Sequence, residues 1–456
     1  MKLKHKTAED DFNLWLGKPA PRYTSFPPAP FFQERDASSE YLSILKALPN
    51  KSKASLYVHI PFCRSQCLYC GCNTCPTNRY ERISQYLASL TQEISLISSC
   101  VRHISIARLH FGGGTPNIIS NEDMLGLFET IRASFDLSGI EEVAMELDPR
   151  EATEDQVRTL AKCGVNRVSL GLQDFTPSVQ TAVNRLQSYE MIQNACIYLR
   201  QNGINRINFD LMYGLPLQTP QSMAKTAELA SSLKPDRIAL FSYAHVPQIK
   251  KHQTVLEQYG IPDPFACLEL EAAARNVLLS KGYTAIGIDH FSKPADPLAV
   301  ALKSGSLRRN FQGYTDDAPD ALIGLGASSI GYIADSYFQN DADVTSYMAK
   351  ICVSEPATKR TYATSPEDKL RKIIIERLMC FFECDIAAAC RELQIKHECL
   401  QEDMKRLQPF LSEGLAAQEG TVIRLASKHK MAIRAICKCF DPYTSASTRT
   451  VSSRTA

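Results

Sequence analysis

Five cysteines lie within thirteen residues of the segment "LYVHIPFCRSQCLYCGCNTCP", which spans positions 56–76. The first three, Cys63, Cys67 and Cys70, have the spacing C-x3-C-x2-C and directly follow a short apolar run that is typical of a strand. Three thiolates on one short loop can hold a cubic iron–sulfur cluster and leave one iron without a protein ligand. This odd number of ligands is what makes the segment informative.

A structural zinc site is the first alternative for this cluster. It needs four donors, usually in two separated pairs, and the second pair would have to come from Cys72, Cys75 or His59 in cramped positions. A disulfide is disfavoured in a reducing compartment. Most of the sixteen cysteines lie singly in apolar helical patterns, so we interpret them as small buried hydrophobic residues: Cys163, Cys196, Cys267, Cys352 and Cys390.

Length and charge limit the class of protein. A chain of 456 residues suggests two or three folding units, one of which could be a large barrel. The 51 basic residues nearly balance the 49 acidic ones, which gives no electrostatic reason to expect nucleic acid as a partner. The first fifteen residues lack the apolar stretch of a secretory signal, and no apolar run reaches about 18 residues. We therefore expect a soluble, cytoplasmic protein.

Six β-rich segments alternate with helical patterns between positions 55 and 243. Parallel strands joined by helices are buried on both faces and form either a doubly wound sheet or most of a barrel. Both architectures place ligand sites at the carboxyl ends of the strands, where the polar and glycine residues of these segments stand. The segments are "SLYVHIP", "IARLHFGGG", "EVAMELDP", "RVSLGLQ", "INFDLMYGLP" and "RIALFSYAHVP".

The flanking regions differ from this βα repeat. Residues 1–50 form a predicted arm with the proline-rich, extended stretch "GKPAPRYTSFPPAPFF", and residues 51–345 form the predicted catalytic domain. A polar linker around "SEPATKRTYATSPEDK" leads to a smaller, mostly helical domain at 360–446, which we predict to be winged-helix-like. We predict that the tail, 447–456, is disordered.

The spacing C-x3-C-x-aromatic-C after the first strand of a βα repeat resembles that of radical S-adenosylmethionine (SAM) enzymes. The motifs "FGGGTP", "MELDP", "RVSLGLQ", "DLMYGLP", "YAHVP", "GIDHF" and "RNFQGYT", in this order, resemble the oxygen-independent coproporphyrinogen III oxidases (dehydrogenases). The resemblance extends from "PRYTSFPPA" to "ICKCFDPY". It implies an α/β fold, an incomplete (β/α)6 TIM-like barrel with an N-terminal arm and a winged-helix-like C-terminal domain.

The resemblance also implies a reaction. One 4Fe-4S cluster with three cysteine ligands and two SAM molecules would generate a 5'-deoxyadenosyl radical. That radical would take a hydrogen from the β-carbon of a propionate, after which carbon dioxide leaves and a vinyl group remains. Two propionates of coproporphyrinogen III treated in this way give protoporphyrinogen IX in haem biosynthesis. The implied partners are the substrate and a low-potential electron donor such as flavodoxin or ferredoxin, and we expect a monomer.

Matched motif by motif, the resemblance assigns residues to the two cofactor molecules. We further expect Tyr57 and Cys72 to be catalytic. From the residues alone, the glycines could form a plain tight turn, Glu146 a structural salt bridge, and Arg185 an exposed helix position. The first SAM would contact the cluster and Tyr57, Gly113 and Glu146; the second would contact Tyr69, Gly114, Thr115, Gln173, Arg185, Asp210, Ala244 and Ile330.

A substrate with four propionates needs cations, and arginine grips carboxylates with two parallel hydrogen bonds. Arg22 and Arg309 are the candidates, with a surface role as the alternative for each, and His290 and Tyr314 are possible pocket residues. Several residues depart from the pattern of the family, and the C-terminal ones bear on substrate contacts: Phe26, Pro28, Ser242, His429, Lys430, Ala435 and Lys438.

Two rival functions remain. The haem-chaperone branch of the same superfamily typically has phenylalanine two residues after the last cluster cysteine, where this chain has Cys72, and it lacks the arm and the "RNFQGYT" segment. A nucleic-acid-binding protein is suggested by the cations of the C-terminal segment, although a basic helix face is usually just solvated. Those cations are Lys428, Lys430, Arg434 and Lys438.

Overall fold

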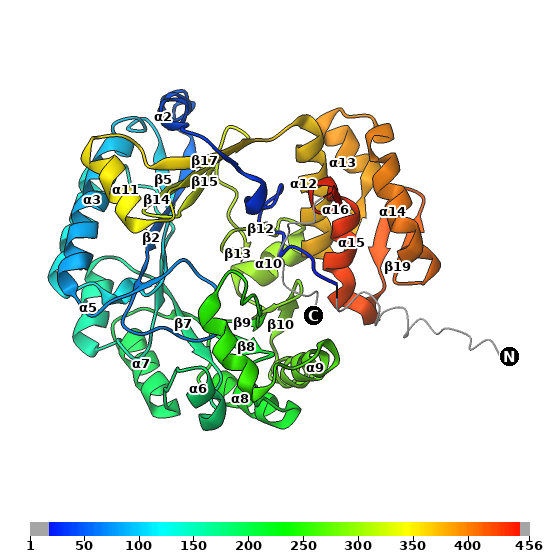
Figure 1. Ribbon diagram of the computed structural model, residues 1–456, viewed down its shortest axis with the longest axis horizontal. Helices are drawn as coiled ribbons and strands as arrows, with labels where there is room; N and C mark the ends of the chain where they lie inside the picture. Colours follow the sequence, from blue (N-terminus) through cyan, green and yellow to red (C-terminus); the bar gives the residue numbers. More distant parts are fainter. Residues whose placement is uncertain (1–17, 447–456) are drawn as a thin grey trace.

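The computed structural model describes residues 18–446 (Figure 1). The first 17 residues of the predicted arm and the predicted disordered tail, 447–456, lie outside the described residues. No helix within the described part of the chain has the length and apolar character needed to cross a bilayer.

Seven adjacent parallel strands form the centre of a thirteen-stranded sheet, in the order β14-β2-β5-β6-β7-β8-β9. Six of them are the segments predicted from the sequence, so the βα repeat is confirmed. The sheet stays open, as expected for an incomplete barrel, because antiparallel strands extend both edges. The strands are β14 (Ala321–Leu325), β2 (Lys53–Ile60), β5 (Ser105–Gly113), β6 (Glu142–Leu147), β7 (Arg167–Gln173), β8 (Arg206–Tyr213) and β9 (Arg237–Ser242).

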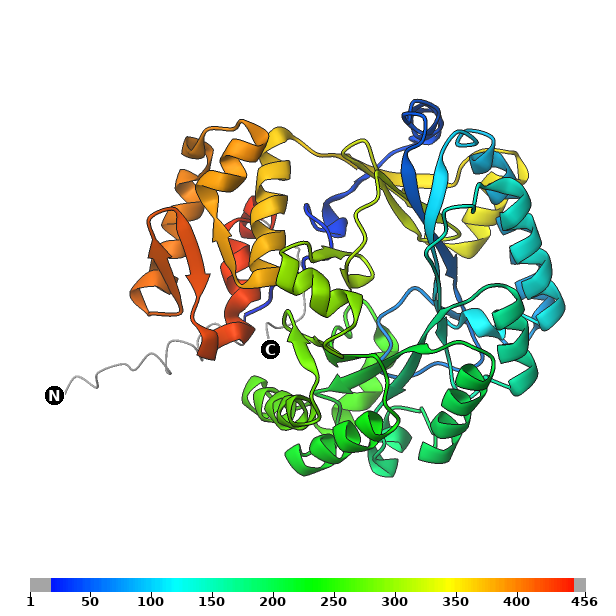
Figure 2. The ribbon, with the colours of Figure 1, turned by 180° about the vertical axis from the view of Figure 1, so that it is seen from behind.

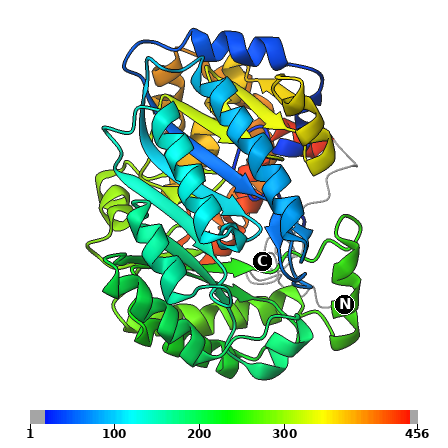
Figure 3. The ribbon, with the colours of Figure 1, turned by 90° about the vertical axis from the view of Figure 1, so that its left-hand side faces the viewer.

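Helices connect these strands and cover the outer face of the sheet (Figure 3). Four of them begin with a serine or threonine whose side chain accepts a hydrogen bond from the backbone N–H three residues later. Such N-caps satisfy donors that a helix start leaves open, each worth about 1 kcal/mol. The helices are α3 (Tyr80–Ser98), α4 (Asn121–Ser134), α5 (Glu154–Lys162), α6 (Pro177–Ala182), α7 (Tyr189–Gln201) and α8 (Pro220–Ser232).

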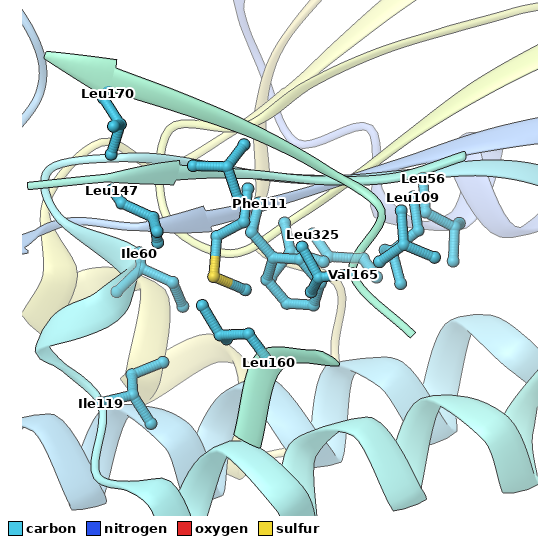
Figure 4. Packing of buried hydrophobic residues seen from close by; sticks show 14 of the residues in the cluster. Leu56, Ile60, Leu109, Phe111, Ile119, Leu147, Leu160, Val165, Leu170 and Leu325 are labelled. Atoms are coloured by element: carbon cyan, nitrogen blue, oxygen red, sulfur yellow. The ribbon is translucent and has the colours of Figure 1, made fainter. Parts of the chain in front are cut away.

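The main core lies between the sheet and these helices (Figure 4). Leu109 and Phe111 of β5 are buried, as are Leu170 of β7 and Leu160 of α5. Burying one such side chain contributes about 1.5–3 kcal/mol. This layer fixes the positions of the strand ends, and the side chains that follow those ends make up the site.

Antiparallel strands that the sequence did not reveal extend the sheet on both sides. One of them, β17 (Thr358–Ala363), lies inside the segment that we interpreted as a polar linker, so that interpretation was wrong. It pairs with β1 (Gln33–Glu34) of the arm, which is therefore attached to the edge of the sheet. The others are β15 (Ile330–Ile333), β16 (Ser336–Asn340), β11 (His290–Ser292) and β10 (Thr284–Ile286).

The C-terminal part of the chain packs around a second apolar core (Figures 1 and 2). Its helices and small three-stranded sheet, in the order β18-β20-β19, agree with the predicted winged-helix-like arrangement. Tyr23 and Phe26 of the arm are buried in this same core. The elements are α12 (Pro366–Phe381), β18 (Glu383–Asp385), α13 (Ile386–Leu393), α14 (Gln401–Ser412), β19 (Ala416–Glu419), β20 (Val422–Leu425), α15 (Ile433–Cys439) and α16 (Pro442–Ala446).

The remaining elements link these layers. They include α2 (Ser38–Lys46), η3 (Lys251–Tyr259), α9 (Pro264–Ser280), α10 (Pro297–Ser304), α11 (Val344–Cys352) and a hairpin of β12 (Arg308–Asn310) with β13 (Gly313–Thr315). Of the five cysteines predicted to be buried outside the cluster, four are buried. Cys352 is exposed because it is the last residue of α11, so that prediction was wrong.

Candidate active site

The cysteine-rich segment forms a loop directly after β2, at the carboxyl end of the parallel strands. A short strand, β3 (Phe62–Cys63), pairs with β4 (Cys75–Pro76) and closes this loop at its base. The hydroxyl of Thr115 donates to Cys63 Sγ at 3.3 Å, and Arg185 Nη1 donates to Cys67 Sγ at 3.5 Å. The loop is therefore fixed from two sides, and both contacts end on predicted cluster ligands.

Hydrogen bonds and burial act differently on the thiols of this loop. Within residues 18–446, no group of three or more histidine, cysteine or acidic side chains is placed to hold a metal ion. Cys70 is poised as a ligand because the side chain of Cys72 hydrogen-bonds to it and lowers its pKa to about 6. The same bond, together with burial, raises the pKa of Cys72. The loop therefore pairs a thiolate at Cys70 with a protonated thiol at Cys72.

A second segment, which the sequence did not reveal, holds the backbone of the cysteine loop. Lys250 Nζ donates to the carbonyl of Cys72 at 2.7 Å, and His252 Nε2 bonds the carbonyl of Cys70 at 2.9 Å. Gln253, fully buried in η3, donates to the carbonyl of Tyr69 at 3.0 Å. Since three donors bind carbonyls along four residues of the loop, this segment fixes the direction in which the cysteine side chains point.

The glycines of "FGGGTP" are required because neighbouring atoms lie too close to leave room for a side chain. A Cβ on Gly114 would lie 2.6 Å from the carbonyl oxygen of Phe62 and 2.9 Å from Cys63 Sγ. A Cβ on Gly112 would lie 2.9 Å from Glu146 Oε1, and Gly113 adopts a φ of 122° that disfavours other residues. The run is therefore more than a plain tight turn, because it lets the end of β5 contact the cysteine loop.

Glu146 lies near the end of β6, next to the glycine run that ends β5. Its carboxylate accepts from the N–H of Gly113 at 3.2 Å and lies 3.4 Å from Nε2 of His110. Burial opposes ionisation, but the His110 and Gly113 contacts outweigh it and lower the pKa of Glu146. The salt bridge considered from sequence is present, yet 42% of the side chain remains exposed. An ionised carboxylate is thus left open to the cavity, where a cationic ligand could reach it.

Tyr57 lies beside this carboxylate. Its hydroxyl is 3.0 Å from His59 Nδ1, and its ring stacks on His110 with centroids 5.9 Å apart. Burial first, then the charges of Glu146 and Cys72, raise the pKa of Tyr57 well above its ordinary value. Tyr57 is therefore a neutral phenol between the β6 carboxylate and the cysteine loop.

Arg185 occupies a position that the sequence did not favour. It is 7% exposed, so the exposed-helix alternative is wrong. Its guanidinium pairs with Asp148 at 3.2 Å and donates to the carbonyl of Gly171 at 2.7 Å, in addition to its contact with Cys67. Its Nε and the side-chain oxygen of Gln173 are buried without a hydrogen-bond partner. These two groups fit a site whose polar ligand would complete their hydrogen bonds.

Asp210, near the end of β8, is the other predicted carboxylate of the site. It accepts from the hydroxyl of Ser169 at 3.0 Å. Burial and the nearby charge of Glu146 raise the pKa of Asp210 to about 6. The charges of Glu146, His290 and Arg185 all affect the ionisation of Asp210, so these side chains lie near one another.

The last members of the predicted set lie around the rim. Gln253 Nε2, which donates to the carbonyl of Tyr69, also donates to the carbonyl of Ala244 at 3.2 Å. Ile330 begins β15 beside Gly324, which is the strand partner of Tyr57. Ile330 therefore stands on the Tyr57 side of the sheet, several strands from Asp210, and its assignment to the second cofactor stays a prediction.

The predicted substrate residues lie on the opposite side of the rim, toward the C-terminal part. Arg309 Cζ lies 4.5 Å from the centre of the Tyr314 ring, and His290 meets the same ring edge-on at 5.3 Å. Arg22 Nη2 donates to the carbonyl of Ser242 at 2.9 Å. Arg22 and Arg309 line one small cavity, although Arg22 also keeps exposed surface, so their assignment to the substrate stays a prediction.

The C-terminal residues that depart from the family pattern face the protein interior or the arm. Lys430 lies over the ring of Phe382 at 4.8 Å, and Lys438 donates to the carbonyl of Pro19 at 3.2 Å. Arg434, which formed part of the basic face considered for nucleic acid, is buried and donates to the carbonyl of Pro21 at 3.0 Å. Lys438 and Arg434 therefore contact the arm, whereas Lys430 packs on Phe382, so these three cations do not form one solvated face; the side chain of Lys428 lies outside the described residues.

Known proteins are similar to this chain over nearly its full length. Residues 57–230 match the model of the radical SAM superfamily. The oxygen-independent coproporphyrinogen III oxidase of Bradyrhizobium diazoefficiens is 41% identical over 93% of this chain and 94% of its own length, and that of Escherichia coli is 37% identical over 93% of each. A solved structure of the Escherichia coli coproporphyrinogen III oxidase, a radical SAM enzyme, superposes with a TM-score of 0.88 at 36% identity, covering 92% of this chain and 97% of that one. This chain therefore belongs to the oxygen-independent coproporphyrinogen III oxidases of the radical SAM superfamily.

Proposed function

We propose that this protein converts coproporphyrinogen III to protoporphyrinogen IX without oxygen, by oxidative decarboxylation of two propionate side chains to vinyl groups in haem biosynthesis. The observation that carries the proposal is the convergence of the three-cysteine loop with an ionised Glu146 and the glycine run at one end of the parallel strands. Membership of the family supports the same reaction.

The three thiols of Cys63, Cys67 and Cys70 are the proposed ligands of one 4Fe-4S cluster. When bound, the cluster and SAM supply the radical that removes hydrogen from the propionate β-carbon. A metal deprotonates the thiols that ligate it, and this offsets the burial that raises the pKa of Cys63. The cations of Arg185 and Lys250 stand close enough to lower the cost of the added negative charge.

Two SAM molecules are proposed to share the hollow. Glu146 offers its carboxylate to the amino group of the first, with Gly113 leaving room for the approach and Tyr57 donating its phenolic proton. Asp210, Gln173 and Arg185 offer an acceptor or donor that the protein leaves incomplete. The second molecule would also contact Tyr69, Gly114, Thr115, Ala244 and Ile330.

Cys72 is proposed to act on the substrate side of the cluster and not as a fourth ligand. It is an exposed residue of the loop, and the hydrogen bond to Cys70 keeps its thiol protonated. The thiol can therefore donate a proton to a group in the cavity without leaving the loop. Cys75 lies at the base of the loop, where its backbone N–H donates to the carbonyl of Pro61 at 2.6 Å.

The proposed partners follow from the chemistry. A low-potential one-electron donor such as flavodoxin or ferredoxin would reduce the cluster, a one-electron acceptor would take the electron released as carbon dioxide leaves, and the protein would work as a monomer. All sixteen cysteines are free thiols, which suits a reducing compartment such as the cytoplasm.

Anaerobic turnover tests the proposal. The reconstituted full-length protein is incubated with coproporphyrinogen III, SAM and a low-potential reductant, and the oxidised products are separated by chromatography. We expect protoporphyrin, which has two carboxylates fewer than coproporphyrin. A protein that leaves all four carboxylates in place but binds haem stoichiometrically would belong with the haem chaperones.

A further inference from the structure

Three arginines from distant parts of the chain line one small cavity next to the active site. Arg22 comes from the arm, Arg309 from the β12–β13 hairpin and Arg434 from α15. The ends of β8 and β9 form the floor, through Tyr213 and Ser242. The cavity therefore lies where the arm, the barrel and the C-terminal domain meet.

Arg22 and Arg309 lack acidic partners among the described residues. Asp289 is the one carboxylate among the described residues that line the cavity, and it already lies 2.6 Å from His290 Nδ1. Within residues 18–446, neither Arg22 nor Arg309 forms an ion pair with an acidic side chain, and each donates to a backbone carbonyl. Charges removed from water normally need such a partner.

Burial affects the guanidinium groups of all three arginines. Two guanidinium nitrogens of Arg309, Nε and Nη1, are buried without a hydrogen-bond partner, while Nη2 donates to the carbonyl of Arg22 at 3.3 Å. Burial lowers the pKa of Arg22, and burial together with the charge of Arg22 lowers that of Arg434 to about 10. Arg22 still retains exposed surface, so it borders a hollow that solvent enters.

The cavity lies beside strand ends that carry predicted site residues. Tyr213 and Ser242, which line it, are the last residues of β8 and β9. Asp210 lies three residues before Tyr213 on β8, and Ala244 follows two residues after Ser242. The three arginines are therefore next to the ends of these two strands. A ligand large enough to reach from the cluster to the arm would place an acidic group among them.

We propose that Arg22 and Arg309 form a carboxylate-binding pocket that grips a propionate of the substrate, one that does not react, with Arg434 as its positioning residue. This inference rests on the proposed function, because coproporphyrinogen III keeps two of its four propionates. A carboxylate supplies the acceptors that the guanidiniums lack, in short charge-assisted hydrogen bonds. Asp289 partly balances the cations while the pocket is empty.

Arg434 acts through the arm. Its guanidinium donates to the carbonyls of Pro21 and Ala20, the two residues before Arg22. Arg309 in turn donates to the carbonyl of Arg22 itself. The arm is thereby fixed at three successive residues, and the Arg22 side chain is directed into the cavity. A lysine at 434 would keep the charge but lose the fork that holds two carbonyls at once.

The test compares Arg309→Met with Arg308→Met in the reconstituted full-length protein. Arg308 is the neighbouring residue but points outward, 53% exposed, to Glu376, so it is a matched control for the loss of one arginine. Anaerobic calorimetry without reductant measures the Kd for coproporphyrinogen III and, separately, for SAM. We expect Arg309→Met to weaken coproporphyrinogen III about 10- to 100-fold while SAM affinity and iron content stay unchanged.

Three further variants and one analogue sharpen this test. Arg22→Met should weaken the binding of coproporphyrinogen III to a similar extent, and Arg309→Lys should weaken it about tenfold. Arg434→Lys should also weaken it, because lysine cannot hold two arm carbonyls at once. Coproporphyrinogen III esterified at all four propionates should bind Arg309→Met and the natural protein equally. Arg309→Lys keeps the charge and volume, so it decides the matter if Arg309→Met does not fold.

Each outcome separates the pocket from the reaction. Unchanged coproporphyrinogen III affinity in both Arg309 variants would overturn the pocket and leave the proposed function standing. Loss of SAM affinity with intact coproporphyrinogen III binding would assign the cavity to the cofactor's carboxylate and also overturn it. A natural protein that neither binds nor converts coproporphyrinogen III would overturn the pocket and the proposed function together.

Discussion

The proposed cofactor side and the proposed substrate side of the site are built in different ways. On the cofactor side, the ends of neighbouring strands β2, β5 and β6 bring backbone and short side chains together, as at Gly114 and Glu146. On the substrate side, long cationic side chains reach in from three segments that lie far apart in the chain. The first region depends on close backbone approach inside one sheet, and the second depends on how the arm and the C-terminal domain pack.

This difference predicts which changes abolish the chemistry and which only weaken a ligand. Changes on the cofactor side should remove the cluster itself, because the atoms of that region are already in close contact. Changes on the substrate side should alter affinity and leave the cluster intact. The predictions below run from the largest expected effect to the smallest.

Substituting Cys63, Cys67 or Cys70 with serine should have the largest effect. A serine oxygen is a poor replacement for thiolate on iron, so each variant should lose the cluster and all turnover. Iron and sulfide analysis after anaerobic reconstitution measures this, with about four of each expected in the natural protein. Full iron in any of the three would mean that the ligands are assigned wrongly.

Gly114→Ala should come close to this effect. The added Cβ would lie 2.6 Å from a backbone oxygen that cannot move without shifting Cys63. We expect loss of at least half of the iron and a fall in turnover of about 10- to 100-fold. Gly126→Ala, in helix α4 with nothing within 4 Å of the new Cβ, is the matched control and should retain both. Equal iron content in the two variants would show that the loop can shift to accommodate the added Cβ.

Cys72→Ser should keep its cluster and lose much of its turnover. Cys72 is an exposed residue of the loop but is not among the three proposed ligands. Cys75→Ser, at the base of the loop, should keep both and serves as the control. The two variants are compared by iron content and by product formed per minute. Iron loss in Cys72→Ser would make Cys72 a ligand, and unchanged turnover would make it a packing residue.

The smallest predicted effect is a pH dependence at Asp210. Its pKa is raised to about 6, so the carboxyl is ionised above this pH and protonated below it. Only the ionised form is a full acceptor for the hydroxyls and the amino group of SAM. Occupancy of the second SAM site should therefore fall as pH drops from 7 to 5, by up to tenfold per pH unit below 6. Asp210→Asn should bind more weakly and show no such dependence; a dependence that persists would come from another group.

The sequence predicts one of the two regions much better than the other. Cys63 follows the end of β2, and Glu146 and Asp210 lie near the ends of β6 and β8, so local patterns locate them and the parallel sheet brings them together. Arg434 and Gln253 become important only through contacts with segments far away in sequence, and no local pattern marks such contacts.

One wrong interpretation and one rejected alternative have the same physical origin. The strand β17 reads as a polar linker, because "TKRTYA" carries charged residues and its pairing partners β16 and β1 come from distant segments. Arg185 reads as an exposed helical residue, because its burial depends on Asp148 and the cysteine loop, neither of which its own neighbours reveal. In both cases tertiary contacts override the local pattern.

One isotope experiment tests most directly that both regions serve a single reaction. Coproporphyrinogen III carrying deuterium on the β-carbons of its propionates is turned over anaerobically, and the 5'-deoxyadenosine formed is analysed by mass spectrometry. If the hollow places that carbon at the cofactor, deuterium should appear in 5'-deoxyadenosine, with about two molecules formed per protoporphyrinogen. Protoporphyrinogen formed while 5'-deoxyadenosine stays unlabelled would contradict the proposed reaction.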